Sequence, residues 1–157
     1  MKYFILTLLF ITMPAFSQEG LSGHNTKQPI VIDADSLEVM QQDKMATFVG
    51  NVVATQGSMT LNSDKMTVYY NEGGQRNGIN KIEASGNVLL TTPSETAKSQ
   101  YGVYDTVQET VFLVEDVVLT RDKNILKGSK LIFNIATGQS KVVRDENERV
   151  RGLFVPE

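Results

Sequence analysis

The chain has 157 residues, of which 41% are hydrophobic and 21% charged, and its net charge is −3. This length and apolar content fit one folded domain. The negative balance, without any run of Lys or Arg, excludes nucleic acid as a partner, because phosphates require a concentrated basic face. The sequence has no Cys, so neither disulfides nor a thiol nucleophile is available.

The first 17 residues predict a cleavable export signal. Lys2 supplies a positive charge, an apolar run follows over residues 3–13, and Ala15 and Ser17 are small residues of the kind a signal peptidase accepts. The run is too short to span a bilayer. We therefore expect cleavage after Ser17, with a retained membrane anchor as the alternative.

The remaining chain predicts an all-β domain behind a flexible lead-in. Residues 18–28 are polar and lack periodicity, whereas residues 29–157 alternate short runs of Val, Ile, Thr, Tyr and Phe with turn residues. No window keeps a helical period for three turns. The predicted turns are residues 41–44, 56–57, 71–74, 77–78, 92–94, 121–124 and 137–138.

Two units recur along this domain and indicate stacked strand pairs. One starts at residues 50–51 (Gly-Asn), returns at 86–87 (Gly-Asn) and returns in altered form at 115–116 (Glu-Asp). The other starts at Ile32, Leu61, Ala97 and Leu126, so its copies lie roughly 29, 36 and 29 residues apart. Two apolar inner faces of such strands would make a sandwich about 10 Å thick.

Alternation within the second unit assigns its side chains to the two faces of each strand. The charged Glu38, Lys65 and Lys130 fall on one parity and are expected to face water. The inner positions are predicted to be Leu37, Val39, Met66, Val68, Gly102, Tyr104, Leu131 and Phe133.

The chain offers no set of residues that predicts catalysis or metal binding. His24 is the single His, and it lies in the lead-in. Asp33 and Asp35 share one strand face, but a glycosidase needs two carboxylates facing each other across a cleft. Residues 145–148 lack the spacing and the Gly of a calcium loop. We expect no enzyme activity, no metal and no cofactor.

Three segments give the chain a resemblance to the OstA-like family of lipopolysaccharide-export proteins. They are residues 28–37, residues 46–57 with 61–65, and the strand order up to 126–130 with the ending at 149–156. The second segment is the most specific, because its turn residues and its apolar parity both match. The resemblance implies a slightly opened antiparallel β-jellyroll in the periplasm of a Gram-negative cell. It also implies that lipopolysaccharide acyl chains lie between its two sheets.

The resemblance further implies which residues contact lipid, with the best support at Ile30, Ile32 and Tyr104. Acyl chains gain roughly 0.8 kcal/mol for each CH₂ removed from water, so an apolar trough can hold them. The expected lipid-binding residues are Ile30, Ile32, Leu37, Val39, Phe48, Met66, Val68, Tyr104, Leu131 and Phe133.

The implied partners are an inner-membrane LptC-like protein, an outer-membrane LptD-like protein and other copies of the chain joined head-to-tail. Unpaired strand edges accept partner strands, which favours the two ends of the domain. The expected partner-binding residues are Pro29, Ile30, Val31, Ile32, Val150, Leu153, Phe154 and Val155. The chain has no nucleotide-binding loop, so a partner must supply the energy for transport.

Two alternatives stay open from the sequence. One is an LptC-like component of the same pathway, which has a similar jellyroll and keeps its N-terminal segment as a membrane anchor. The other is a structural β module that polymerises through its strand edges and binds no lipid. In that case the inner residues are ordinary core residues of a closed sandwich.

Overall fold

The structure, a computed structural model, describes residues 25–71, 78–147 and 149–156. The predicted signal, the Ser17 cleavage site, His24 and the turn around residues 72–77 lie outside these residues. The strands are β1 (Val31–Asp33), β2 (Ser36–Met40), β3 (Met45–Gln56), β4 (Met59–Asn71), β5 (Gly78–Thr91), β6 (Thr96–Asp105), β7 (Thr110–Arg121), β8 (Asn124–Asn134), β9 (Gln139–Val143) and β10 (Arg151–Leu153). The predicted all-β fold is confirmed.

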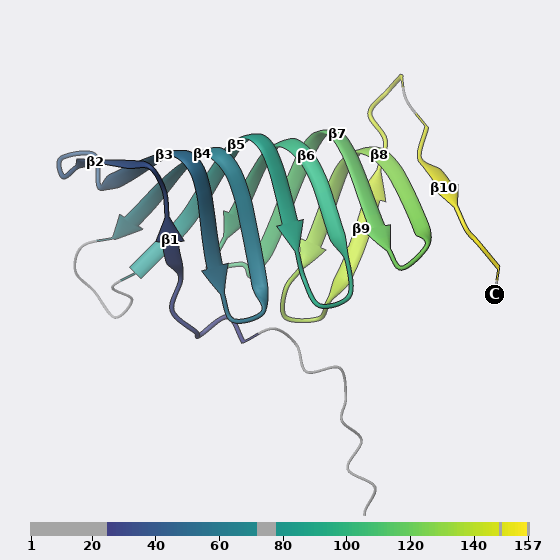
Figure 1. The fold of residues 1–157 in the computed structure, drawn as a ribbon, viewed down its shortest axis with the longest axis horizontal. Coiled ribbons are helices and arrows are strands. Elements are labelled where there is room, and N and C mark those ends of the chain that lie inside the picture. Colours follow the sequence, from purple (N-terminus) through teal and green to yellow (C-terminus); the bar gives the residue numbers. More distant parts are fainter. Residues whose placement is uncertain (1–24, 72–77, 148, 157) are drawn as a thin grey trace, which may run out of the picture.

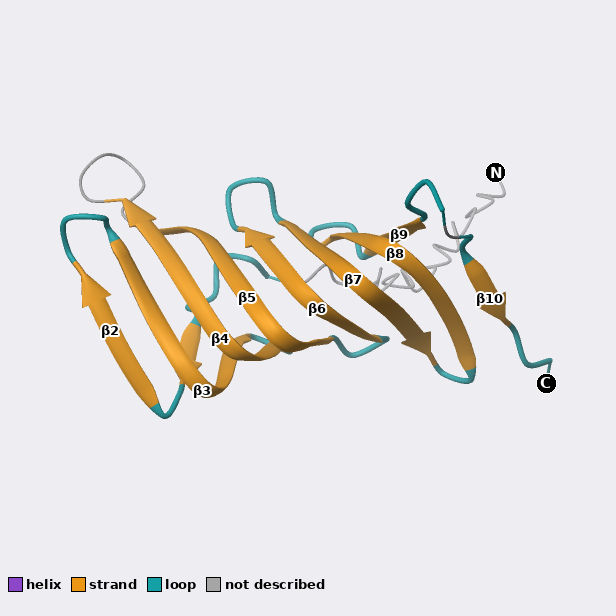
Figure 2. Ribbon diagram, turned by 90° about the horizontal axis from the view of Figure 1, so that it is seen from above, coloured by secondary structure: helices purple, strands orange, loops and turns teal. Residues whose placement is uncertain are grey.

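All strands belong to one antiparallel sheet that folds back on itself (Figures 1 and 2). Its order is β1-β3-β4-β5-β6-β7-β8-β10, while β2 also pairs with β3 and β9 also pairs with β8. Each long strand runs through two layers. We call the layers the β1 layer, which contains β1 and β10, and the β2 layer, which contains β2 and β9.

The layers meet at a bend in the middle of each long strand. The pairing register shifts there in every pair from β3·β4 to β7·β8. In β3 the bend is at Gly50 and Asn51 (φ 86° and 46°), and in β5 it is at Gly86 and Asn87 (φ 77° and 48°). Two consecutive residues in the left-handed region redirect the strand, which glycine and asparagine tolerate best.

An aspartate from the neighbouring position in the sheet braces each of these two bends. Asp35 lies between β1 and β2, and Asp64 lies in β4. The Asn51 side-chain amide donates to Asp35 at 2.9 Å, and the Asn87 amide donates to Asp64 at 2.8 Å. A Cβ at Gly86 would lie 2.4 Å from the Asp64 carboxylate, so only glycine fits. The Gly-Asn repeat in the sequence is therefore a device for bending the sheet.

This arrangement corrects the sequence interpretation in one respect. The recurring unit at residues 50–51, 86–87 and 115–116 does not start a strand, and the two predicted sheets are the two halves of one sheet. The positive φ angles of Glu115 (67°) and Asp116 (55°) place the third, altered copy at the bend of β7. These residues interrupt the β-forming runs in the sequence, so they marked the start of a repeating unit and not a bend inside a strand.

The core lies between the layers, and most of the residues that were predicted to face inward are buried in it. Met66, Val68, Tyr104, Leu131 and Phe133 are all buried. The burial prediction is wrong for the pair in β2, since Leu37 and Val39 are 56% and 52% exposed. Their strand lies at the end of the sheet, where among the described residues it pairs with β3 alone. Gly102 is buried, Glu38 and Lys65 are exposed, and Lys130 is partly buried.

Candidate binding groove

The cross-strand register lines up the inner residues in rows that run the length of the sheet. In the β2 layer one row joins Leu37, Phe48, Met66, Ala84, Gly102, Leu113, Leu131 and Val142. In the β1 layer the facing row joins Ile32, Ala54, Leu61, Leu90, Ala97, Leu119, Leu126 and Gly152. Neither row contains a polar side chain. Along these two rows the inner surface is therefore apolar from one end of the sheet to the other, while Gln56 and Glu95 are buried polar residues beside it.

The middle of this space is filled by side chains, and its ends are open. Ile82, Ala84 and Leu113 in the middle have no exposed surface. At the N-terminal end Ile30, Ile32 and Phe48 are only partly buried, beside the exposed Leu37 and Val39. We call these last five residues the N-terminal mouth.

The ten predicted lipid-binding residues thus divide into two groups on one inner surface. The five residues of the N-terminal mouth are accessible, whereas Met66, Val68, Tyr104, Leu131 and Phe133 belong to the packed core. The fold brings all ten to the inside of the bent sheet. Their role toward lipid stays a prediction.

The predicted partner-binding residues lie at the two ends of the sheet. β1 pairs only with β3 and β10 only with β8, so within the described chain the outer edge of each has no strand beside it. Val31, Val150, Leu153, Phe154 and Val155 are exposed, at 42–68% of their surface. Pro29 is also exposed, and Ile30 and Ile32 are partly buried.

A polar contact joins the two layers on the side away from the bends. The Tyr104 hydroxyl donates to the Gln56 side-chain oxygen at 2.8 Å, between the β2 layer and the β1 layer. Burial raises the pKa of Tyr104 to about 12. The Gln56 amide in turn donates to the carbonyls of Thr26 and Gln28 at 2.8 and 2.9 Å, and the Thr26 hydroxyl donates to Glu109. The segment before β1 therefore lies across this side.

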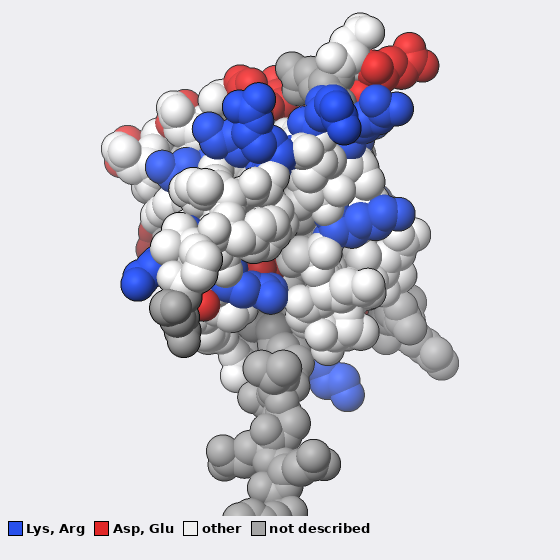
Figure 3. Space-filling model, turned by 90° about the vertical axis from the view of Figure 1, so that its right-hand side faces the viewer, with Lys and Arg blue, Asp and Glu red and all other residues white. Residues whose placement is uncertain are grey.

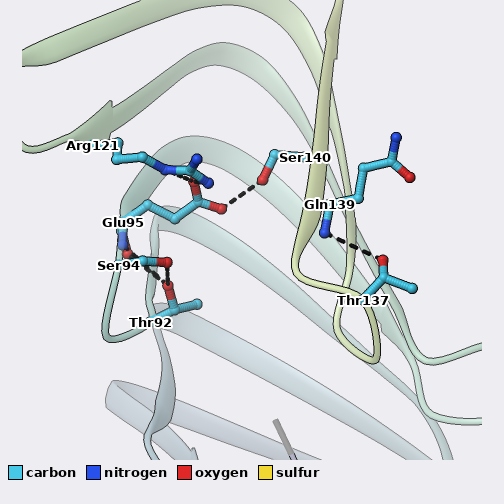
Figure 4. Close-up of polar contacts among 7 residues, drawn as sticks. All are labelled: Thr92, Ser94, Glu95, Arg121, Thr137, Gln139 and Ser140. Carbon is cyan, nitrogen blue, oxygen red and sulfur yellow. Dashed lines mark hydrogen bonds and ion pairs between the residues drawn. The ribbon is translucent and has the colours of Figure 1, made fainter. Parts of the chain in front are cut away.

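A second polar contact joins the layers at the C-terminal end, where a cavity of about 430 Å³ lies. Glu95 is the centre of this contact, and its side chain is only 4% exposed. Its carboxylate accepts from Arg121 of the same layer at 2.7 Å and from the Ser140 hydroxyl of β9 at 2.5 Å (Figure 4). Leu119, Leu126 and Phe154 also line the cavity, which we call the C-terminal mouth.

The sequence interpretation missed Glu95, Arg121 and Gln56. The chain around Glu95 was assigned to a turn because Pro93 and Ser94 precede it. Strand parity held the missing signal, since Ala97 points inward and residues two apart share a face. An acidic residue in phase with inward positions predicts a buried carboxylate that needs a partner.

Outside the groove, a group of three interacting polar side chains lies on the outer face of the β2 layer. Lys81 pairs with Glu83 at 2.7 Å and lies 4.2 Å from the Tyr69 ring centre, while the Tyr69 hydroxyl donates to Glu83 at 3.0 Å. Partial burial acts to raise the pKa of Glu83, but the hydrogen bonds from Lys81 and Tyr69 outweigh it and lower that pKa. This group braces neighbouring strands.

The described residues offer neither a metal cluster nor a membrane-spanning helix. Across residues 25–71, 78–147 and 149–156, no three His, Asp or Glu side chains gather closely enough to hold a metal ion. In the same residues no helix is long and apolar enough to cross a bilayer.

Known proteins are similar to this chain in sequence, and a solved structure is similar to it in fold. The chain is 34% identical over 130 residues to an uncharacterized protein of Rhizobium meliloti strain 1021, covering 79% of this chain and 69% of that protein. It is 29% identical over 157 residues to the lipopolysaccharide export system protein LptA of Escherichia coli K12, covering 96% and 81%.

A solved structure has the same architecture. It is LptH, described as the LptA-homologous periplasmic component of the lipopolysaccharide transport device of Pseudomonas aeruginosa. The match has a TM-score of 0.73 and 21% identity, and it covers 86% of this chain and 99% of that one. Residues 31–139, from β1 to the start of β9, match the family described as LptA/(LptD N-terminal domain) LPS transport protein. The chain therefore belongs to the family of LptA and LptD N-terminal-domain lipopolysaccharide transport proteins.

Proposed function

We propose that this protein carries lipopolysaccharide across the periplasm, with the acyl chains held between the two layers, and that it is not an enzyme. The observation that carries the proposal is the inner surface, whose apolar rows run without interruption to both ends of the sheet. Family membership supports the substrate class, because a relative named for lipopolysaccharide export is similar in sequence and a solved structure of a lipopolysaccharide transport component has the same fold.

Lipid can fill the middle of the groove only if the layers move apart. The backbone joins the layers at the bends, on one side alone (Figure 1). On the other side, polar contacts between the layers in the described part of the chain include Tyr104 to Gln56 and Ser140 to Glu95. Each such hydrogen bond contributes only about 1 kcal/mol, while each buried CH₂ of an acyl chain contributes roughly 0.8 kcal/mol. A few acyl carbons therefore offset the loss of these polar contacts, and contacts with the acyl chains replace the core contacts that the layers lose on separating.

Site-specific crosslinking tests this proposal. A photoreactive amino acid at position 32 or 104, on the inner surface, should crosslink to lipopolysaccharide. The same amino acid at position 65, which is exposed on the outer face of β4, should not. A structural β module would give no crosslink at positions 32 and 104. Equal crosslinking at all three positions would indicate adsorption to the surface and would contradict the groove.

We also propose that the two sheet ends join this protein to neighbours, namely an inner-membrane LptC-like protein, an outer-membrane LptD-like protein and further copies of itself. The family includes the N-terminal domain of LptD, so a partner of related fold would offer a matching edge. An unpaired edge strand is the surface on which β-augmentation acts.

The strand directions permit copies to join head-to-tail. Neighbouring strands are antiparallel across the whole order β1-β3-β4-β5-β6-β7-β8-β10. This order has an even number of positions, so β1 and β10 run in opposite directions. A second copy placed with its β1 beside β10 therefore continues the antiparallel alternation, and its inner apolar rows continue as well.

On the outer face of each layer, one cross-strand row of residues begins with an acidic residue and ends with a basic one. This difference in charge between the two ends supports the same head-to-tail joining. The row that starts at Asp33 in β1 ends at Arg151 in β10. The row that starts at Glu38 in β2 ends at Lys141 in β9. In a continuous sheet Asp33 of one copy would lie beside Arg151 of the next, with Glu38 beside Lys141 in the other layer.

We propose further that residues 1–17 are removed on export, that residues 18–28 lead into the domain, and that residues 29–157 form it. Sequencing the N-terminus of the protein recovered from the periplasm tests this. A start at Gln18 supports the soluble bridge, whereas a start at Met1 supports the membrane-anchored, LptC-like alternative.

A further inference from the structure

We propose that the C-terminal mouth binds the phosphorylated head of an anionic lipid. Arg121 is the residue that contacts the phosphate, and Glu95 is the residue that positions Arg121. The inference rests on the proposed function for the source of the lipid. It does not depend on the joining of copies.

The first argument is a buried carboxylate beside the apolar wall of the cavity, paired with a half-exposed guanidinium. Glu95 is 4% exposed and faces Leu119, Leu126 and Phe154 across the cavity. Removing the Glu95 carboxylate from water costs several kcal/mol, and apolar residues of similar size often stabilise a protein as well as an ion pair or better. Stability alone therefore gives no reason for this pair, while a charged ligand does.

The second argument is the way in which the guanidinium is held. The Arg121 Nε and one Nη both donate to the same Glu95 oxygen, at 3.1 and 2.7 Å. A guanidinium carries five N–H groups in a rigid plane, and 52% of the Arg121 side chain is exposed. One edge is thus fixed against Glu95 while donors remain at the solvent side. The planar fork matches the oxygens of a phosphate.

The third argument is that Glu95 is itself held in place from both layers. The backbone N–H of Glu95 donates to the Thr92 hydroxyl at 3.2 Å, and its carbonyl accepts from the Thr92 N–H at 2.9 Å. The second carboxylate oxygen accepts from Ser140 of β9. Figure 4 shows Glu95 between Arg121 and Ser140, with Thr92 beneath it. The site is preorganised, so a ligand does not have to order it.

The fourth argument is that the cavity is amphipathic and lies at a basic end of the molecule. Its apolar wall of Leu119, Leu126 and Phe154 suits an acyl chain, which free phosphate lacks. Figure 3 looks at this end and shows Lys and Arg side chains around an uncharged area, with Asp and Glu side chains along the upper edge. Exposed Lys127, Lys141 and Arg151 come from the end strands. Their summed field favours an approaching anion.

The test uses the double variant E95Q/R121Q in the full mature chain. This variant removes the ion pair without leaving a buried unpaired charge, and it keeps the net charge. Binding is measured by calorimetry with bisphosphorylated lipid A and with dodecyl maltoside, an uncharged amphiphile. We expect lipid A to bind at least roughly tenfold more weakly than to the wild type, while maltoside binding is unchanged. R144Q, which changes an exposed Arg that does not line the cavity, should leave lipid A binding within about twofold.

Three results would overturn the inference. Equal lipid A affinity of E95Q/R121Q and the wild type would mean that Arg121 does not contact the phosphate. Equal losses for lipid A and maltoside would mean that the pair only shapes the apolar wall. Inorganic phosphate binding as tightly as lipid A would identify free phosphate as the ligand. If the wild type binds no lipid A at all, the proposed function itself fails, which separates the two failures.

Discussion

The two ends of the sheet have the same backbone plan and different chemistry. At each end the last strand position is split between the layers, into β1 and β2 at one end and β9 and β10 at the other. The N-terminal mouth is entirely apolar, with Leu37 and Val39 more than half exposed. The C-terminal mouth adds an ion pair, the buried Glu95 with the half-exposed Arg121, to its apolar wall.

This difference gives direction to a molecule whose backbone plan is nearly symmetric. The outer rows begin with acidic residues at one end and finish with basic residues at the other. Two like ends would repel each other through these charges, whereas unlike ends attract. Apolar rows alone would allow a lipid to pass either way. The charged residues are therefore what distinguishes one end from the other.

The largest expected effect comes from blocking either end. Ile32→Asp at the N-terminal end and Phe154→Asp at the C-terminal end should each abolish end-to-end assembly while the monomer stays folded. A charge on an edge prevents another strand from pairing there. Size-exclusion chromatography over a range of concentrations, with circular dichroism to check folding, measures both outcomes. Unchanged assembly in either variant would refute the role of that end.

The next largest effect is expected at the bends, which divide each long strand between the two layers. Gly86→Ala should destabilise the protein by roughly 2–4 kcal/mol, because the new Cβ would lie 2.4 Å from Asp64 at a backbone φ of 77°. Gly78→Ala is the matched control, since a Cβ there meets nothing within 4 Å. Urea unfolding compares the two. Similar losses in both variants would show that the bend does not require glycine.

A third effect should appear in alkaline solution at the contact nearer the N-terminal mouth. Tyr104 has a pKa of about 12 in the folded protein and about 10 when unfolded. Because the folded pKa is the higher, the stabilisation is complete below pH 10 and is lost as the pH rises toward 12, by roughly 2 kcal/mol. Unfolding curves at pH 9, 10 and 11 measure the loss.

The control for the alkaline effect is Tyr104→Phe. This variant should be about 1 kcal/mol less stable at neutral pH, because the hydrogen bond to Gln56 is lost. Its stability should then fall less steeply above pH 10 than that of the wild type. The same slope in both proteins would assign the alkaline loss to other groups.

The smallest effect concerns the charges at the ends. Glu38→Lys and Lys141→Glu should each weaken self-association several-fold, since each turns an attraction between copies into a repulsion and exposed pairs are worth up to about 1 kcal/mol. The double variant E38K/K141E should recover the wild-type affinity, because the pair is restored in reverse. Sedimentation velocity measures all three variants. Additive losses in the double variant would contradict the proposed register.

The sequence predicted the strands well and the bends poorly. Alternating apolar residues identified the inner positions of β4, β6 and β8, since a period of two is a local property of a strand. The Gly-Asn repeat was also visible, but its role was not. Whether Gly50 and Asn51 interrupt a strand or bend it depends on Asp35, which lies between β1 and β2 and braces them.

The candidate site divides in the same way. The apolar rows follow from parity, and the ten predicted lipid-binding positions, which the family resemblance implied, all lie on the inner surface. The ion pair could not be predicted from the sequence, because Arg121 lies 26 residues after Glu95, and Ser140 lies 45 residues after it. Their meeting requires the strand register and the closing of two layers.

The sequence by itself determined an all-β chain with one apolar face per strand, because side-chain alternation is set within a few residues. Only the tertiary structure decided which of those faces are buried and which are open. Leu37 and Met66 occupy the same row, yet Leu37 is 56% exposed and Met66 is fully buried. The physical reason is that burial depends on neighbouring strands on both sides, and a strand at the end of the sheet has only one.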